Sequence, residues 1–389
     1  MSKSISILLI MQVIVLSCGS QHERLDFAPA SGSPFAVGRR PGSISVGDVN
    51  NDRKLDVVTA NEGSRDVTIL LGDGRGAFKQ APGSPVEVGA PVIFVAMGDL
   101  NKDGNLDLAL AQHDDSQEVI VLMGDGKAGF KPAPNSPFLP LKSTDAHNHG
   151  LVLADVNGDG ALDMLTANGG INRGRFDESV SVSLGDGKGD FKPAAGSPFR
   201  IGRLPAGVVV ADVNQDDKPD IVVNTEASRD LIVLHGNGRG GFSAAPGSPI
   251  PLIKYSSGVA IGDLNNDDRA DIVVGHDDSG LLTLLSGEGA ARFNVAEGYP
   301  IDLGYRAWIK FVADTNQDGK ADLIIRGPND HITVLLGDGK LGFKEAKGSP
   351  FPVGKDPFGM AVGDINADGR PDILTANNAS DNVTLLLGR

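Results

Sequence analysis

The sequence predicts an all-β protein, a seven-bladed β-propeller, and three observations carry that prediction. The first is a nine-residue loop with Asp, Asn, Asp and Asp at positions 1, 3, 5 and 9, which occurs seven times at spacings of 50 to 57 residues. A fixed period of this length is typical of propellers and solenoids. The second is composition: 52 Gly and 23 Pro in 389 residues separate short apolar runs, which is an all-β profile.

The third observation is a split repeat at the two ends of the chain. A Phe- and Pro-rich phrase ends each complete repeat, as in Phe343–Phe351, but the first copy, Phe27–Phe35, precedes the first acidic loop. The chain ends at Arg389 without such a phrase. We therefore expect the N-terminal strand to complete the last blade, which closes a ring and leaves no open sheet edge. A solenoid has no need of this permutation.

Each blade is expected to hold four strands. In the first blade these are strand A at Ile44–Gly47, strand B at Val57–Ala60, strand C at Val67–Leu71, and strand D from Phe78 through the Pro-rich phrase. Strands B and C are continuous apolar runs because both of their faces are buried between neighbouring blades. A Gly-Asp-Gly turn connects C to D, and the prolines of D suit an outer edge strand.

The loop between strands A and B has the pattern of a calcium site. Calcium takes six to eight oxygen ligands, and alternating residues of a tight loop can direct carboxylate and amide oxygens to one point. In the last loop Gly369 permits the turn and the Arg370 carbonyl is the expected main-chain ligand. The side-chain ligands predicted on this pattern are Asp48, Asn50, Asp52, Asp56; Asp99, Asn101, Asp103, Asp107; Asp155, Asn157, Asp159, Asp163; Asp212, Asn214, Asp216, Asp220; Asp263, Asn265, Asp267, Asp271; Asp314, Asn316, Asp318, Asp322; and Asp364, Asn366, Asp368, Asp372.

Up to seven calcium ions would have a structural role and would account for much of the acidic charge. The formal net charge is −15, and seven divalent ions would bring it to about −1. Such an acidic chain lacks the basic footprint of a nucleic-acid binder. The loops with Arg53, Asp217 and Asp268 at position 6, where the others have Gly, are expected to be the weakest sites.

The repeated unit resembles a known family. It reads Gly-Asp-hydrophobic-Asn-x-Asp-x-x-x-Asp-hydrophobic, followed by Leu-Leu-Gly-(Asp/Asn)-Gly, and over residues 27–389 it is similar to the FG-GAP/VCBS-type repeats of integrin-α-like propellers. The Phe-Gly…Gly-Ala-Pro signature of integrin blades is not intact, so the bacterial VCBS-like branch is the better match. The resemblance implies calcium in the A–B loops and a scaffold role in adhesion, glycan binding or protein binding.

The N-terminus has the features of an export signal. Lys3 precedes an apolar segment at Ile5–Leu16 that is too short for a comfortable membrane span. Ser17-Cys18-Gly19 resembles the lipobox of bacterial lipoproteins, with Cys18 as the lipidated residue; a plain signal peptide is the alternative. We expect residues 1–17 to be the signal peptide, 18–26 a tether and 27–389 the propeller. The protein would then be anchored by lipid at the outer membrane or cell surface, or otherwise be periplasmic or secreted. A single cysteine permits no internal disulfide.

The candidate ligand face is the one opposite the acidic loops, where the D–A and B–C loops are expected. Six of seven blades place a cation there, often beside an aromatic residue, which could concentrate an anionic ligand. The alternative is ordinary solvated charge, offset by Asp114, Asp115, Asp277 and Asp278. The candidates are Arg39, Arg40, Lys142, His147, His149, Arg203, Lys254, Tyr255, Tyr305, Arg306, Trp308 and Lys355.

A binding scaffold is therefore the predicted function, with a protein or glycan ligand, and a monomer is expected. The sequence has no Gly-x-Ser-x-Gly elbow, no His-Glu-x-x-His motif and no second cysteine. The alternative is an enzyme that acts on polysaccharides, lyase- or dehydrogenase-like, on the same face. His147 and His149 could bind a transition metal, but no third ligand is evident, which favours a plain polar loop.

Overall fold

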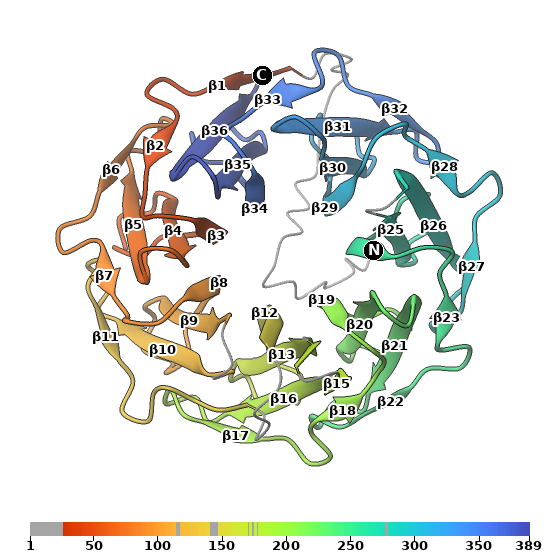
Figure 1. The fold of residues 1–389 in the computed structure, drawn as a ribbon, viewed down its shortest axis with the longest axis horizontal. Coiled ribbons are helices and arrows are strands. Elements are labelled where there is room, and N and C mark those ends of the chain that lie inside the picture. The colour runs from red at the N-terminus through yellow and green to blue at the C-terminus, as the bar shows by residue number, and fades with distance from the viewer. Residues whose placement is uncertain are drawn as a thin grey trace, which may run out of the picture.

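The computed structural model is a closed ring of seven antiparallel sheets around a central channel (Figure 1). It describes residues 26–113, 117–140, 147–169, 171–172, 175–176, 178–276 and 279–389. All the regular elements in these ranges are strands, so the predicted all-β, seven-bladed propeller is confirmed. None of the described elements is a helix long and apolar enough to cross a membrane.

Every blade has the strand order A–B–C–D from the channel outward. Strand A is β3 (Pro41–Gly47), β8 (Val92–Gly98), β12 (His147–Ala154), β19 (Pro205–Ala211), β24 (Ser256–Gly262), β29 (Trp308–Ala313) and β34 (Pro357–Gly363). Strand B is β4 (Asp56–Asn61), β9 (Asp107–Gln112), β13 (Asp163–Gly169), β20 (Asp220–Thr225), β25 (Asp271–His276), β30 (Asp322–Arg326) and β35 (Asp372–Asn377).

The two outer strands complete each blade. Strand C is β5 (Asp66–Gly72), β10 (Val119–Gly124), β16 (Ser179–Gly185), β21 (Asp230–Gly236), β26 (Leu281–Gly287), β31 (His331–Gly337) and β36 (Asn382–Gly388). Strand D is β6 (Phe78–Gln80), β11 (Phe130–Pro132), β17 (Phe191–Pro193), β22 (Phe242–Ala244), β27 (Phe293–Val295), β32 (Phe343–Glu345) and, for the last blade, β1 (Phe27–Pro29). A separate pair, β14 (Ile171–Asn172) and β15 (Arg175–Phe176), follows strand B of the third blade.

Strand D does not run through the Pro-rich phrase as the sequence suggested. It ends after three residues, and a second short strand later in the phrase pairs with the same strand C. Between the two, a serine hydroxyl takes the place of a backbone acceptor, as where Ser84 Oγ accepts from the Ile69 amide at 2.9 Å. The second strands are β7 (Val86–Glu87), β18 (Phe199–Arg200), β23 (Ile250–Pro251), β28 (Ile301–Asp302), β33 (Phe351–Pro352) and β2 (Phe35–Ala36), with an isolated bridge at Phe138 in blade two.

The ring closes as predicted, because the N-terminal strand completes the last blade. Strand β1 pairs with β36, with Phe27 opposite Gly388, and the two lie together in Figure 1. The Ala30 amide donates to the Leu385 carbonyl at 2.9 Å, and Ser33 Oγ accepts from the Leu385 amide at 3.0 Å. These bonds join the chain's two ends and remove the open edge of the sheet.

The core lies between blades, where apolar faces of neighbouring sheets meet. Strand B is buried on both faces; Val57 and Val58, for example, are fully buried. An outer belt of edge-to-face phenylalanine pairs links consecutive blades. These pairs are Phe35–Phe78 (5.1 Å between ring centroids), Phe138–Phe191 (5.3 Å), Phe199–Phe242 (5.4 Å) and Phe27–Phe351 (5.3 Å).

The loops form two distinct faces. On one face the D–A and B–C loops bond to each other, as where the Glu62 amide donates to the Arg40 carbonyl. On the other face the C–D turn of one blade bonds to the A–B loop of the preceding blade, as where the Ala128 amide donates to the Val49 carbonyl. The predicted separation of acidic loops from the D–A and B–C loops is therefore confirmed, and the two groups are called the acidic-loop face and the ligand-candidate face below.

Candidate functional site

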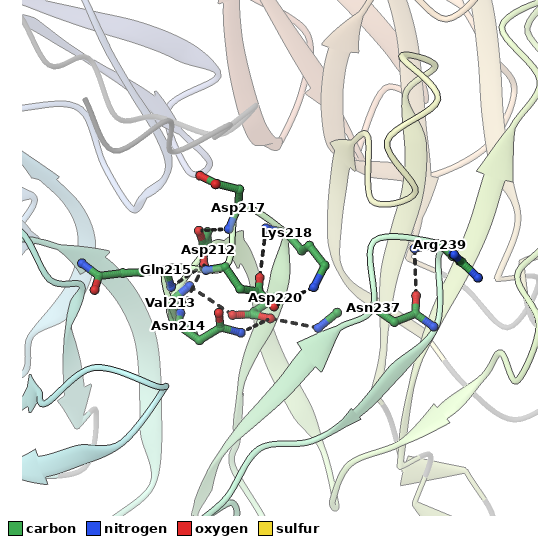
Figure 2. A network of polar contacts seen from close by, with 11 residues as sticks. Asp212, Val213, Asn214, Gln215, Asp217, Lys218, Asp220, Asn237 and Arg239 are labelled. Atoms are coloured by element: carbon green, nitrogen blue, oxygen red, sulfur yellow. Dashed lines mark hydrogen bonds and ion pairs between the residues drawn. The ribbon is translucent and has the colours of Figure 1, made fainter. Parts of the chain in front are cut away.

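Each acidic loop is shaped by its own side-chain oxygens. In the fourth blade, shown in Figure 2, Asp212 Oδ1 accepts from the Gln215 amide at 2.7 Å and Oδ2 accepts from the Asp217 amide at 2.8 Å. Asp216 Oδ1 accepts from the Lys218 amide at 3.0 Å. The loop backbone therefore turns around the side chains at positions 1 and 5, which accept its amide hydrogen bonds.

The backbone of the loop is left-handed at positions 4 and 6 in every blade. Position 6 has positive φ whether it is glycine, as Gly104 (84°), or not, as Arg53 (66°), Asp217 (62°) and Asp268 (62°). A residue with a Cβ adopts this conformation at a cost of roughly 1 kcal/mol or more. Whether these three loops hold calcium most weakly stays a prediction.

The aspartate at position 9 is a clasp between strands. Asp220 Oδ2 accepts from the Val213 amide at 3.1 Å and Oδ1 accepts from the Gly236 amide at 2.9 Å, so it joins the A–B loop to the end of strand C (Figure 2). The other six loops repeat the arrangement, and all seven aspartates are fully buried: Asp56, Asp107, Asp163, Asp220, Asp271, Asp322 and Asp372.

Burial raises the pKa of these clasp carboxyls although backbone amides bind them. The pKa of Asp56, Asp163 and Asp220 rises to about 6, and that of Asp322 and Asp372 to about 7. Burial is the largest cause, because it disfavours the charged form; neighbouring carboxylates of the same loop add to the rise. A nearby cation would relieve this cost.

The side-chain ligands of each loop are oxygen atoms, which suit a hard cation, although these oxygens do not converge on one point. Among the residues that the structure describes, no group of three or more His, Cys, Asp or Glu side chains is drawn together to hold a metal ion. The reason is visible in the clasp, whose two oxygens face backbone amides. A carboxylate has about four lone-pair sites, so it can accept an amide and still coordinate an ion. Oxygen-only donors with three carboxylates a loop are the chemistry that calcium prefers.

The ligand-candidate face exposes most of the predicted side chains. Arg39, Arg203, Lys254, Tyr255, Arg306 and Lys355 are exposed there. Arg40 pairs with Glu62 at 2.8 Å, and Arg229 lies 4.6 Å from the Tyr255 ring. Tyr305 instead packs against a buried core cluster, and Trp308 lies under Arg326, 3.9 Å from its guanidinium carbon, so these two are not free platforms.

A third histidine joins the predicted pair. The His113 ring lies 5.6 Å from that of His147 and 5.8 Å from that of His149, and its Nδ1 is 3.3 Å from Glu62 Oε1. Burial, then the charges of His113 and His147, lowers the pKa of His149 to about 4, so this ring is neutral at pH 7. Sequence reasoning missed His113 because it comes from the preceding blade, 34 residues upstream of His147.

Several predicted features lie outside the described residues. They are the signal segment with Cys18, Lys142 in the third D–A loop, and the acidic residues Asp114, Asp115, Asp277 and Asp278.

Comparison with known proteins agrees with the class that the fold and loops define, a propeller built from acidic-loop repeats. The FG-GAP-like repeat model matches residues 48–110, 99–166, 170–223 and 314–375. These segments cover more than half of the chain, which therefore belongs to the FG-GAP-like repeat family. No curated protein sequence matches it.

Solved structures share the fold at low identity. A crystal structure of BBS1N in complex with ARL6DN, soaked with mercury, is 13% identical with a TM-score of 0.61, over 94% of this chain and 97% of that one. Virginiamycin B lyase from Staphylococcus aureus is 14% identical with a TM-score of 0.55, over 93% of this chain and 98% of that one. At such identities the likeness concerns the fold alone.

Proposed function

We propose that the protein is an exported, calcium-stabilised scaffold that binds a protein or glycan ligand on its ligand-candidate face. The observation that carries the proposal is a set of exposed cations on the face opposite the acidic loops. Lys254, Arg306 and Lys355 are exposed there. On a chain of net charge −15, exposed cations gathered on one face can attract anionic ligands and orient their approach.

Calcium is proposed as the structural cofactor, held by positions 1, 3 and 5 with the position-9 clasp. It would neutralise three carboxylates in each loop, of which the clasp is the buried one. No step of ligand binding is assigned to the ions, since their loops lie on the opposite face from the proposed ligand.

Binding rather than catalysis is proposed because the exposed candidates of the described ligand-candidate face, such as Lys254, Tyr255 and Arg306, are recognition groups. The BBS1N structure is a propeller in complex with a protein, ARL6DN; by analogy of fold, protein binding is a natural use of such a face. Export and a lipid anchor at Cys18 are proposed from the N-terminal sequence.

The experiment is a binding screen with calcium-loaded protein against envelope extract and a panel of acidic glycans. The test variant is Lys254→Glu/Arg306→Glu; both residues are exposed and neither has an ion pair with a described residue. The matched control is Lys79→Glu/Lys131→Glu, with the same charge change on exposed outer strands β6 and β11. We expect the test variant to bind the captured ligand at least about tenfold more weakly and the control to bind like the parent.

Equal weakening in both variants would mean that only net charge matters, and equal capture by the test variant would remove this face as the binding site. Any product formed from an acidic polysaccharide would favour the enzymatic alternative.

A further inference from the structure

Strand A of the sixth blade, β29, has its β-bulge at a different position from strand A of the other six blades. In those, a β-bulge inserts the residue that stands six places before the first loop aspartate: Gly42, Ile93, His149, Ala206, Ser257 or Phe358. In β29 the inserted residue is Lys310, only four places before Asp314. A bulge redirects the side chain of its extra residue. The shift by two residues therefore places a lysine on the channel wall where the other blades have an apolar residue, such as Val208, Val259 or Met360.

The channel contains a cavity of about 230 Å³ lined by strand A residues of all seven blades. Its described wall is mostly glycine and aliphatic residues, and Lys310 and His149 are the only titratable side chains among the lining residues that the structure describes. His149 is neutral at pH 7, because burial lowers its pKa to about 4. Figure 1 shows their strands, β29 and β12, on opposite sides of the channel. Among these described lining residues, Lys310 is therefore the one charged group on a largely apolar wall.

Lys310 has no ion pair with a residue that the structure describes. Its Nζ lies 5.6 Å from the Trp308 ring and 5.5 Å from the Phe358 ring. The nearby carboxylate, Asp356, binds Arg326 at 2.5 Å instead. Burial, then the charge of Arg326, lowers the pKa of Lys310 to about 8, although Asp356 acts to raise it.

We propose that this cavity, here called the channel pocket, binds a small amphipathic carboxylate, with its carboxylate at Lys310 Nζ and its apolar body against the aliphatic wall. Lys310 is the one cation among the described lining residues, which matches a ligand with one carboxylate. The cavity is smaller than the roughly 300–1,000 Å³ of sites for drug-sized molecules, so the ligand is small. The site is separate from the rim proposed above and does not depend on it.

Trp308 makes the proposal directly testable, since it is the only tryptophan in the chain. Its emission is recorded while the calcium-loaded, full-length protein is titrated with octanoate. Octanol serves as the matched probe without charge, and acetate as the carboxylate without an apolar body. We expect a saturable change with octanoate and at least about tenfold weaker responses to the other two, because each lacks one half of the recognition.

Two variants test whether the octanoate response depends on Lys310. Lys310→Met keeps the length of the side chain and removes its charge, and should weaken octanoate binding at least about tenfold. Lys131→Met, the same change on the exposed strand β11, should bind octanoate like the parent. Equal binding of octanoate and octanol, or unchanged octanoate affinity in Lys310→Met, would overturn the proposal, as would the absence of any saturable response. The octanoate–octanol comparison uses the unmodified protein, so it decides even where a variant fails to fold.

Discussion

The position-9 aspartate holds two strands of its blade together through both carboxylate oxygens. In the third blade, Asp163 accepts from the Val156 and Gly185 amides, each at 2.9 Å. The calcium pattern predicts this residue only as a ligand. The clasp depends on the register that brings strand C beside the loop, and a linear motif does not contain that register.

Replacing Asp163 by Ala is expected to lower the free energy of unfolding by about 2–4 kcal/mol even with calcium chelated, because two buried amides lose their acceptor. Asp159→Ala is the matched control: Asp159 is exposed and accepts from the Ala161 amide at 2.8 Å. Its loss should cost less than about 1 kcal/mol in chelator. Urea denaturation measures both, and equal costs in chelator would refute the clasp.

Lys310 and His113 show where residue-level prediction ends. A lysine in the apolar run Trp308–Ala313 is visible in the sequence. Its place on the channel wall follows from a bulge shifted by two residues, which depends on pairing with β30. His113 approaches His147 only because adjacent blades meet at their edges. Contacts between blades are long-range, whereas the acidic loops are local in sequence and could be predicted from it.

At the scale of the element, the Pro-rich phrase is a strand whose middle is replaced by a serine contact. Proline has no amide to donate, so a continuous strand D is excluded there. The serine before it takes over the strand C amide in six blades, through Ser33, Ser84, Ser136, Ser197, Ser248 and Ser349. The repeated Phe and Pro residues correctly predicted an outer strand. The serine hydroxyl contact could not be predicted in this way, because it depends on the geometry of the turn.

Ser248→Ala is expected to lower the free energy of unfolding by about 1 kcal/mol, because the Val233 amide loses its acceptor at 3.0 Å. Ser243→Ala makes the same chemical change in the same blade at an exposed position of β22 and should stay within about 0.5 kcal/mol of the parent. Thermal or urea unfolding distinguishes them. If the two variants unfold alike, the serine contact does not stabilise the blade.

At the scale of the molecule, the closed ring places the acidic loops on one face and the D–A and B–C loops on the other. Local loops concentrate carboxylates on the acidic-loop face, and the permuted N-terminal strand closes the ring by pairing with β36. The sequence predicted this architecture because its period and its split repeat are properties of the whole chain. It could not predict which rim side chains are free, since Tyr305 packs into the core and Arg40 pairs with Glu62.

Calcium removal should therefore act on the whole ring. At millimolar calcium and a Kd of order 10⁻⁴ M, one site adds roughly 1.4 kcal/mol, and seven add about 10 kcal/mol, comparable with the stability of a domain. Excess chelator should lower the melting temperature by at least about 10 °C, as measured by differential scanning calorimetry. Calcium should restore it and magnesium should not, because magnesium demands a tighter octahedral shell than flexible loops provide. A melt that chelator leaves unchanged would mean that the clasps alone hold the loops, and calcium would then have no structural role in this protein.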